Sequence, residues 1–253
     1  MTPRHVWRDP SLRPVVAASL TLSLAIGVFG VSFGVGAVSA GASVAQACVM
    51  SLLVFTGASQ LSAVSVIAAG GTTASALGGA LVLAARNGVY ALTMGRRVRG
   101  RLPTRLVAAQ LTIDESTAVG IAQETDPLAR QGFWQTGLAV FVFWNLMTLA
   151  GALVGNTLGD PRTWGLDAAA AGAFCALLWP RLRRREAQAT AVIAVVLTLV
   201  AMPHTPAGVP VLVAALAAAV VAGWPGARRT AAAPSSPEPP PAGNAATAEE
   251  DAR

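Results

Sequence analysis

The chain has 253 residues and a mean hydropathy of +0.58, and 54% of its residues are hydrophobic. Its formal net charge of +6 comes from arginine, since the chain contains no lysine. The 71 residues from Val15 to Ala85 include no Asp, Glu, Lys, Arg or His, whereas a membrane-spanning helix needs roughly 20 apolar residues. We therefore expect an all-α, polytopic membrane protein. The arginines lie in short clusters between apolar segments, which excludes a nucleic-acid-binding protein and any sizeable soluble domain.

Eight apolar segments follow one another along the chain. They cover residues 15–40, 45–69, 74–95, 106–125, 132–158, 164–180, 188–203 and 209–225. We expect six to eight of them to span the membrane, with discontinuous or re-entrant helices among them. Residues 15–226 would form the transmembrane permease domain, preceded by a cytoplasmic segment at residues 1–14. Residues 227–253 are rich in proline and end in acidic residues, which predicts a disordered cytoplasmic tail.

The first segment carries Gly27, Gly30 and Gly34 on one helical face. Glycine lets membrane helices approach one another closely, so we expect this face to pack against another span. Residues 30–34 also match the G-x-S-x-G pattern of a serine nucleophile, but that motif requires a preceding strand and a histidine base. We therefore interpret the glycines as a packing face, and we predict that the chain is not an enzyme and has no catalytic residues.

The second segment is interrupted by the sequence Thr56-Gly57-Ala58-Ser59-Gln60. We expect a helix discontinuity here, whose half-helix ends would offer free backbone N–H and C=O groups to a substrate. Gly57, Ser59 and Gln60 are therefore candidate substrate-binding residues. An alternative is an intramembrane serine protease with Ser59 as nucleophile, for which only His204 is remotely available as a base.

The arginine clusters constrain the topology. They are Arg4/Arg8/Arg13, Arg96 to Arg105, Arg181 to Arg185, and Arg228/Arg229. The positive-inside rule places all four in the cytoplasm, yet three apolar segments separate the first cluster from the second and three more separate the second from the third. Either one segment in each triplet fails to cross, or the loop at 95–105 breaks the rule. The best candidates for not crossing are 45–69, because of its break, and 106–125, because it contains Asp114 and Glu115. Both termini are then cytoplasmic.

Several polar side chains fall at membrane depth. They are Arg86 with Asn87 and Tyr90 in the third segment, Asp114 and Glu115 in the fourth, and Asp167 in the sixth. Intramembrane charges are costly and usually face each other or a cavity. Arg86 therefore requires either a fixed carboxylate or the carboxylate of a bound substrate, and we favour the substrate. A guanidinium opposite a carboxylate would suit a zwitterion, with the acidic residues contacting its ammonium group or carrying a coupling proton.

The ordered set of these features resembles the AzlC family of membrane proteins. The matching residues are Phe29-Gly30, Met50-Ser51, Phe55 to Gln60, Arg86 with Tyr90, Asp114-Glu115, Leu166-Asp167 and Leu178-Trp179-Pro180, within roughly residues 12–222. Family members commonly have Asn-x-Arg-His around the arginine, whereas this chain has Ala84-Ala85-Arg86-Asn87 and lacks that imidazole.

This resemblance implies a secondary transporter subunit in the bacterial inner (plasma) membrane that exports branched-chain or similar apolar amino acids, coupled to protons. It also implies a small hydrophobic partner subunit of the AzlD type. From the residues themselves we expect a substrate site that includes Arg86, Asn87 and Tyr90, and no cofactor or metal. A further alternative is an accessory membrane subunit whose polar residues only hold a partner.

Overall fold

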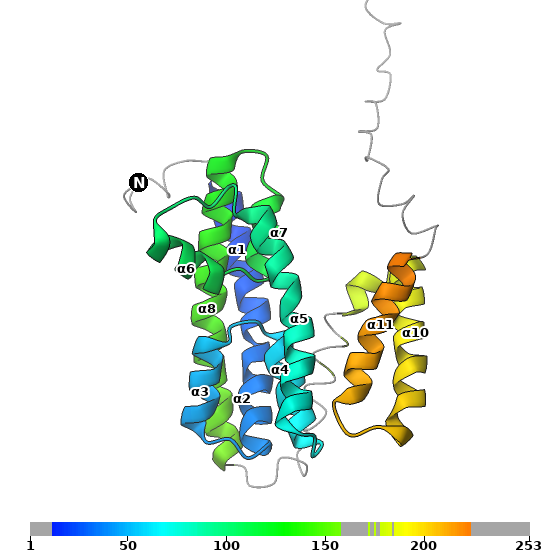
Figure 1. The fold of residues 1–253 in the computed structure, drawn as a ribbon. Coiled ribbons are helices and arrows are strands. Elements are labelled where there is room, and N and C mark those ends of the chain that lie inside the picture. Colours follow the sequence, from blue (N-terminus) through cyan, green and yellow to red (C-terminus); the bar gives the residue numbers. More distant parts are fainter. Residues whose placement is uncertain (1–11, 158–171, 173–174, 176–177, 184, 224–253) are drawn as a thin grey trace, which may run out of the picture.

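The computed structural model describes residues 12–157, 172, 175, 178–183 and 185–223, and within them every regular element is a helix (Figure 1). The helices are α1 (Arg13–Gly27), α2 (Phe29–Ser39), α3 (Val44–Leu53), α4 (Ala58–Ala68), α5 (Thr73–Met94), α6 (Leu102–Gln110), α7 (Asp114–Ile121), α8 (Asp126–Thr157), α10 (Arg185–Ala201) and α11 (Val209–Gly223), with short 3₁₀ helices at Trp179–Arg183 and Met202–His204. The all-α expectation is confirmed for this part of the chain.

Helices α1 and α2 form one nearly continuous rod that packs along α8. This rod runs parallel to α8. Val15 at the start of α1 lies beside Gly132 near the start of α8, and Val35 in α2 lies beside Gly155 near the end of α8. Gly34 packs so closely on the α8 backbone at Thr148 that a Cβ atom there would clash. The predicted glycine packing face on the first segment is therefore confirmed.

Helices α3 and α4 form a hairpin that covers only part of the length of α8. Ser51 on α3 donates a hydrogen bond to Thr148, in the second half of α8 (3.2 Å). The hairpin therefore lies beside that half, in the lower part of Figure 1. The two helices have 10 and 11 residues, so each is about 15 Å long, roughly half the thickness of the hydrocarbon core. The discontinuity predicted at residues 56–60 is confirmed.

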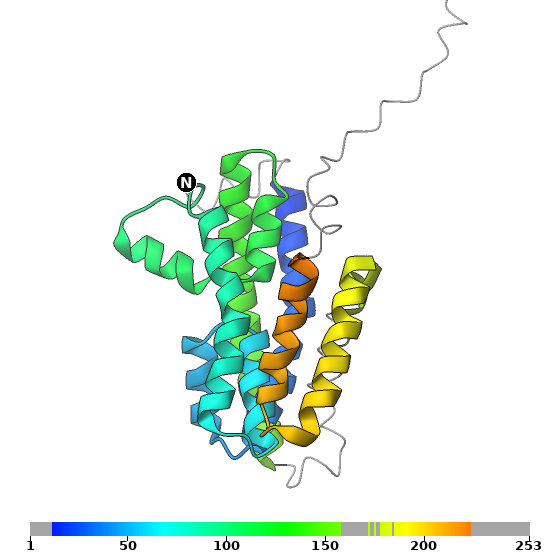
Figure 2. The ribbon, with the colours of Figure 1, turned by 45° about the vertical axis from the view of Figure 1, so that its right-hand side comes forward.

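In a second hairpin, α6–α7, helix α7 lies beside the other half of α8 and α6 projects from the bundle (Figure 2). Gly137 in the first half of α8 packs against Leu111, and Gly120 at the end of α7 lies near Ala129. These helices have nine and eight residues. The two segments that the arginine pattern marked as non-crossing, 45–69 and 106–125, are thus both short hairpins, and they approach the middle of the bundle from opposite ends (Figure 1).

Helix α5 runs antiparallel to α8, because Arg97, just beyond its end, contacts Asp126 at the start of α8. Helix α11 runs parallel to α5, since Ser75 donates a hydrogen bond to Ala207 O (3.0 Å) and Gly79 lies near Val211. The start of α1, the end of α5, the start of α10 and the end of α11 therefore lie at one end of the molecule (Figure 1). We call this the arginine-rich end.

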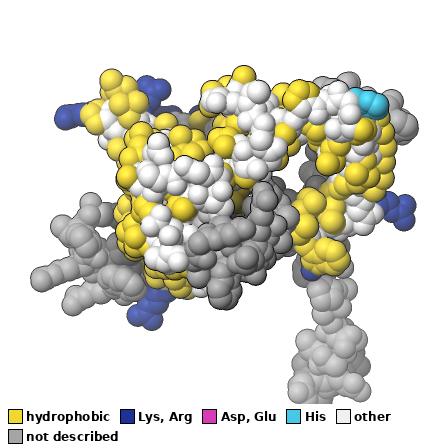
Figure 3. Space-filling view, turned by 90° about the horizontal axis from the view of Figure 1, so that it is seen from below, with side chains coloured by type: hydrophobic (Ala, Val, Ile, Leu, Met, Phe, Trp, Pro, Cys, Tyr) yellow, Lys and Arg dark blue, Asp and Glu magenta, His cyan; other side chains and the backbone are white. Residues whose placement is uncertain are grey.

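Among the described residues, three helical stretches are long and apolar enough to cross a membrane: Arg13–Ser39, Asp126–Thr157 and Arg185–His204. Large hydrophobic side chains on the outer faces are exposed, as lipid contact requires, and hydrophobic side chains dominate the periphery when the molecule is viewed from the end opposite the arginines (Figure 3). The count of six to eight spans stays a prediction. The terminal segments 1–14 and 227–253 fall almost entirely outside the described residues, as does most of 164–180.

Candidate functional site

The break between α3 and α4 is built around Gly57 and Gln60. Gly57 has φ +60° and ψ −83°, a conformation that L-residues rarely adopt. Its N–H donates to Gln60 Oε1 (3.1 Å), and Gln60 Nε2 donates to Met50 O on α3 (3.4 Å). Gln60 is fully buried. Its side chain therefore links the two half-helices: it accepts from the Gly57 N–H, which the break leaves without a helical partner. It also adds a second donor at Met50 O, which already accepts from the Val54 N–H (2.8 Å).

The break between α6 and α7 is built in the same way. The N–H of Ile113 donates to Ser116 Oγ (3.1 Å), and this hydroxyl donates to Leu111 O (2.6 Å). In both hairpins, the third residue of the second half-helix caps the residue that precedes that helix. The two breaks also meet, because Gln110 Nε2 at the end of α6 donates to Leu52 O near the end of α3 (2.8 Å). Half-helix ends from opposite ends of the molecule are thus brought together.

Arg86 and Asp114 form an ion pair at this meeting point. Arg86 projects from the second half of α5, and its Nη1 lies 2.7 Å from Asp114 Oδ2. Asp114 is the first residue of α7, where the positive end of the helix dipole stabilises a carboxylate. The two side chains are 31% and 18% exposed. Of the two partners that the sequence allowed for Arg86, the structure has the fixed carboxylate; a guanidinium has further N–H groups for a second acceptor.

A cavity of about 240 Å³ opens beside this ion pair. Its polar wall consists of Thr56, Gly57, Arg86, Asp114 and Glu115. The remaining lining residues are Ile26, Phe29, Phe55, Ala58, Leu61, Leu83, Ile113, Val140, Trp144 and Leu178. Its volume is below the roughly 300–1,000 Å³ of pockets for drug-sized ligands. A small ligand with one charged or zwitterionic end and an apolar remainder matches this lining.

Aromatic contacts fix two of the apolar side chains. Phe55 packs edge-on against Phe141 with ring centroids 5.0 Å apart, and Trp144 stacks on Phe33 at 6.4 Å. Trp144 is only 4% exposed. Sequence reasoning did not identify the cavity walls at Phe29, Phe55 and Trp144, because isolated aromatic residues in apolar segments do not differ from ordinary core or lipid-facing positions.

Four of the predicted site residues line the cavity: Gly57, Arg86, Asp114 and Glu115. Ser59 and Gln60 are buried in the first turn of α4 and are not among the lining residues. Asn87 and Tyr90 follow Arg86 on α5 but also do not line it, and Asp167 lies outside the described residues.

The protease alternative requires a base within hydrogen-bond reach of Ser59. Within the described residues, Ser59 Oγ is buried and has no hydrogen-bond partner. His204 is exposed in the turn between α10 and α11. The geometry of a serine nucleophile is therefore absent from the described part of the chain.

Comparison with known proteins gives one match. The family model described as AzlC protein matches residues 21–158, which is more than half of the chain and extends from α1 just past the end of α8. This range includes both hairpins, the ion pair and all lining residues of the cavity except Leu178. It stops before Leu166-Asp167 and Leu178 to Pro180, which the sequence resemblance had included. No curated protein and no solved structure matches the chain.

Proposed function

The chain belongs to the AzlC family, which is related to branched-chain amino acid transport, and we propose that it is the substrate-carrying subunit of a secondary transporter that exports branched-chain or similar apolar amino acids. The observation that carries this proposal is the Arg86–Asp114 ion pair in the wall of a small, otherwise apolar cavity. That combination supplies opposite charges for the two ends of a zwitterion and an apolar wall for its side chain.

In this proposal the substrate carboxylate binds Arg86, and the ammonium group approaches Asp114 or Glu115. A guanidinium can hold two acceptors at once, so the ion pair need not break completely when substrate binds. The apolar residues around it, among them Leu61 and Val140, favour a branched aliphatic side chain over a polar one, because buried polar groups without partners are costly.

The arrangement of the hairpins supports access from one side at a time. Each hairpin approaches the cavity from a different end of the molecule, and discontinuous helices that meet at the substrate site are typical of secondary transporters. Movement of α3–α4 would open the cavity to one side, and movement of α6–α7 to the other. The Gln110 bond to Leu52 O would hold the two tips together in the state described here.

We further propose that Asp114 or Glu115 carries the coupling proton. A proton on Asp114 would remove the charge that holds Arg86 and so link protonation to the state of the ion pair. Each charge moved across the membrane contributes about 2.3 kcal/mol per 100 mV, which is sufficient to drive export. The arginine-rich end would face the cytoplasm of a bacterial cell, with both termini on that side.

The experiment is efflux of labelled leucine from proteoliposomes that contain this chain, its AzlD-type partner, or both, with and without a pH gradient. We expect saturable efflux that needs both chains, responds to the gradient and is inhibited by isoleucine and valine. Arg86→Gln should abolish it. The control Arg13→Gln removes an exposed charge at the start of α1 and should leave it unchanged.

Two results would contradict the proposal. Efflux that is as fast with the partner alone as with both chains would leave this chain an accessory role. Retained efflux in Arg86→Gln would show that transport does not depend on this cavity.

A further inference from the structure

A second cavity, of about 390 Å³, lies at the arginine-rich end between α6 and the neighbouring parts of α5 and α8. It is separate from the site proposed above. Its apolar lining is Ala91, Met94, Val98, Ala108, Ala109 and Phe133, and it also contains Gly95, Gly100 and Thr112. Two arginines, Arg99 and Arg105, are its charged lining residues. We call it the α6 groove. A mainly apolar groove with two cationic side chains suits an anion that carries a hydrocarbon chain.

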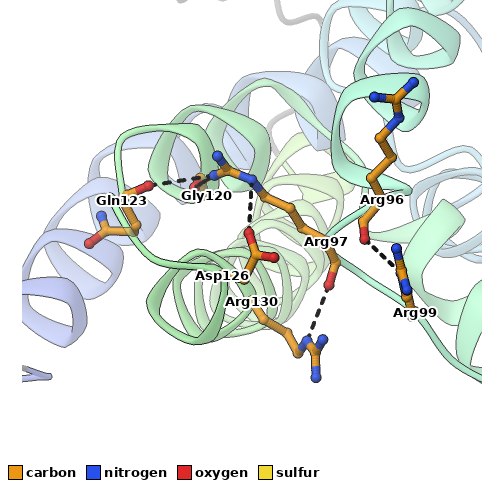
Figure 4. A network of polar contacts seen from close by, with 7 residues as sticks. All are labelled: Arg96, Arg97, Arg99, Gly120, Gln123, Asp126 and Arg130. Carbon is orange, nitrogen blue, oxygen red and sulfur yellow. Dashed lines mark hydrogen bonds and ion pairs between the residues drawn. The ribbon is translucent and has the colours of Figure 1, made fainter.

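The arginines at this end are not equivalent (Figure 4). Arg97 joins neighbouring elements, because its Nε lies 3.5 Å from Asp126 Oδ1 and its Nη1 donates to Gly120 O at the end of α7 (3.2 Å). Arg99 donates one bond, from Nε to Arg96 O (3.1 Å). Neither Arg99 nor Arg105 has an ion pair with another described residue. The two groove arginines therefore keep guanidinium N–H groups for an external anion.

The part of helix α6 before its last turn combines exposed apolar and cationic side chains, as segments at a membrane surface do. It projects from the bundle (Figure 2), and Leu102, Leu106 and Val107 are 67%, 62% and 52% exposed. These side chains require hydrocarbon, whereas Arg105 in the same helix requires water or an anion. The boundary between lipid headgroups and acyl chains provides both environments. The groove therefore lies where the phosphate of a phospholipid and the beginning of its acyl chains would be found.

We propose that the α6 groove is a specific binding site for an anionic diacyl phospholipid such as phosphatidylglycerol. Its phosphate would bind Arg99 and Arg105, since the guanidinium fork matches phosphate oxygens. An acyl chain would lie against Ala91 and Ala109, the apolar lining residues whose side chains are exposed. Thr112, at the break between α6 and α7, lines the same groove, so the bound lipid would also stabilise the position of the second hairpin.

The test uses the purified full chain in a neutral detergent, to which phosphatidylglycerol, phosphatidylcholine with the same acyl chains, or inorganic phosphate is added. Lipid retention is measured by native mass spectrometry, and thermal stability by the unfolding midpoint. We expect phosphatidylglycerol to be retained and to raise the midpoint, and the other two additives to have little effect. Equal effects of both lipids, or equal stabilisation by phosphate, would overturn the proposal of an anionic lipid site.

Variants locate the effect. Arg99→Gln/Arg105→Gln should raise the phosphatidylglycerol concentration at half-saturation about tenfold. The control Arg183→Gln/Arg185→Gln removes two exposed charges outside the groove and should leave it unchanged. Ala109→Phe fills the groove without altering charge and should also weaken retention, which keeps the test valid if the double arginine variant does not fold. Equal loss in the control, or unchanged retention in Ala109→Phe, would show that the lipid responds to net charge and not to the groove.

Discussion

Replacement of Gly57 by alanine tests whether the break between α3 and α4 depends on a backbone conformation reserved for glycine. A Cβ atom at this position would meet nothing closer than Trp144 Cη2, at 3.6 Å, which is an ordinary contact. The cost must therefore come from φ +60° and ψ −83°, and a strained residue of this kind costs about 1–3 kcal/mol. We expect the free energy of unfolding, measured by titration with sodium dodecyl sulfate in mixed micelles, to fall by that amount.

The matched control is Gly36→Ala. A Cβ atom at Gly36 would lie 3.5 Å from Val64 Cγ1, nearly the same spacing, but Gly36 is inside helix α2. Alanine is favoured over glycine there by up to about 1 kcal/mol, so the two variants should change stability in opposite directions. If Gly57→Ala is as stable as the unmodified chain, or if both variants shift equally, backbone strain does not determine the residue at this break.

Two further predictions concern buried polar contacts, and the same unfolding titration measures both. Gln60→Leu should lower the free energy of unfolding by about 1–3 kcal/mol, because it leaves the Gly57 N–H without its partner and removes the bond to Met50 O. Gln46→Leu, which removes an exposed cap at the start of α3, should cost less than about 1 kcal/mol, and equal costs would contradict this explanation. Thr136→Val removes the buried hydrogen bond that Thr136 Oγ1 donates to Ser19 Oγ (2.8 Å) and should cost about 0.6 kcal/mol, a typical value for membrane helices. The hydroxyl of Thr93 bonds only within its own helix at an exposed position. The stability of Thr93→Val should therefore stay within about 0.5 kcal/mol of the unmodified chain. A larger loss would contradict the explanation that the cost of Thr136→Val comes from its bond between helices.

The two short hairpins were predictable because they follow from counting, whereas the number of membrane crossings stays a prediction. Arginine clusters on one side of the membrane require an even number of crossings between them, and the residues that weaken a spanning helix, at Gly57 and at Asp114, identified both hairpins. The charge-free run and the glycine face on the first segment are equally local signals, which is why the all-α architecture and the close packing of the first segment could be anticipated.

The site itself was predictable only in part. Arg86 had three carboxylates within the sequence as candidate partners, and only the fold brings Asp114 to it. Gln60 was expected to face substrate, whereas in the structure it bridges the break, a role that depends on the rotamer and not on the residue type. The bond between Gln110 and Leu52 joins residues 58 positions apart, and no sequence period indicates such a contact.

The function proposed for the cavity depends on an ion pair and an apolar pocket lying together, and the sequence did not indicate that they would. An ion pair alone would serve stability equally well, and an apolar pocket alone would be a packing defect. Their combination at the meeting point of two half-helix hairpins gives the charged and apolar surfaces that an amphiphilic zwitterion needs. The aromatic residues Phe55 and Trp144 limit the cavity to a small side chain, and this limit is a property of the assembled fold.

The most direct test of the central claim is calorimetric titration of leucine into the purified chain and into Arg86→Lys. Lysine keeps the positive charge beside Asp114, so the protein should still fold, but an ammonium group cannot reproduce the planar fork that holds two acceptors. The loss of a charge-assisted hydrogen bond of about 1.5–3 kcal/mol predicts leucine binding that is weaker by about 10- to 150-fold. Unchanged leucine affinity in Arg86→Lys would show that Arg86 only pairs with Asp114 and that the cavity is not the substrate site.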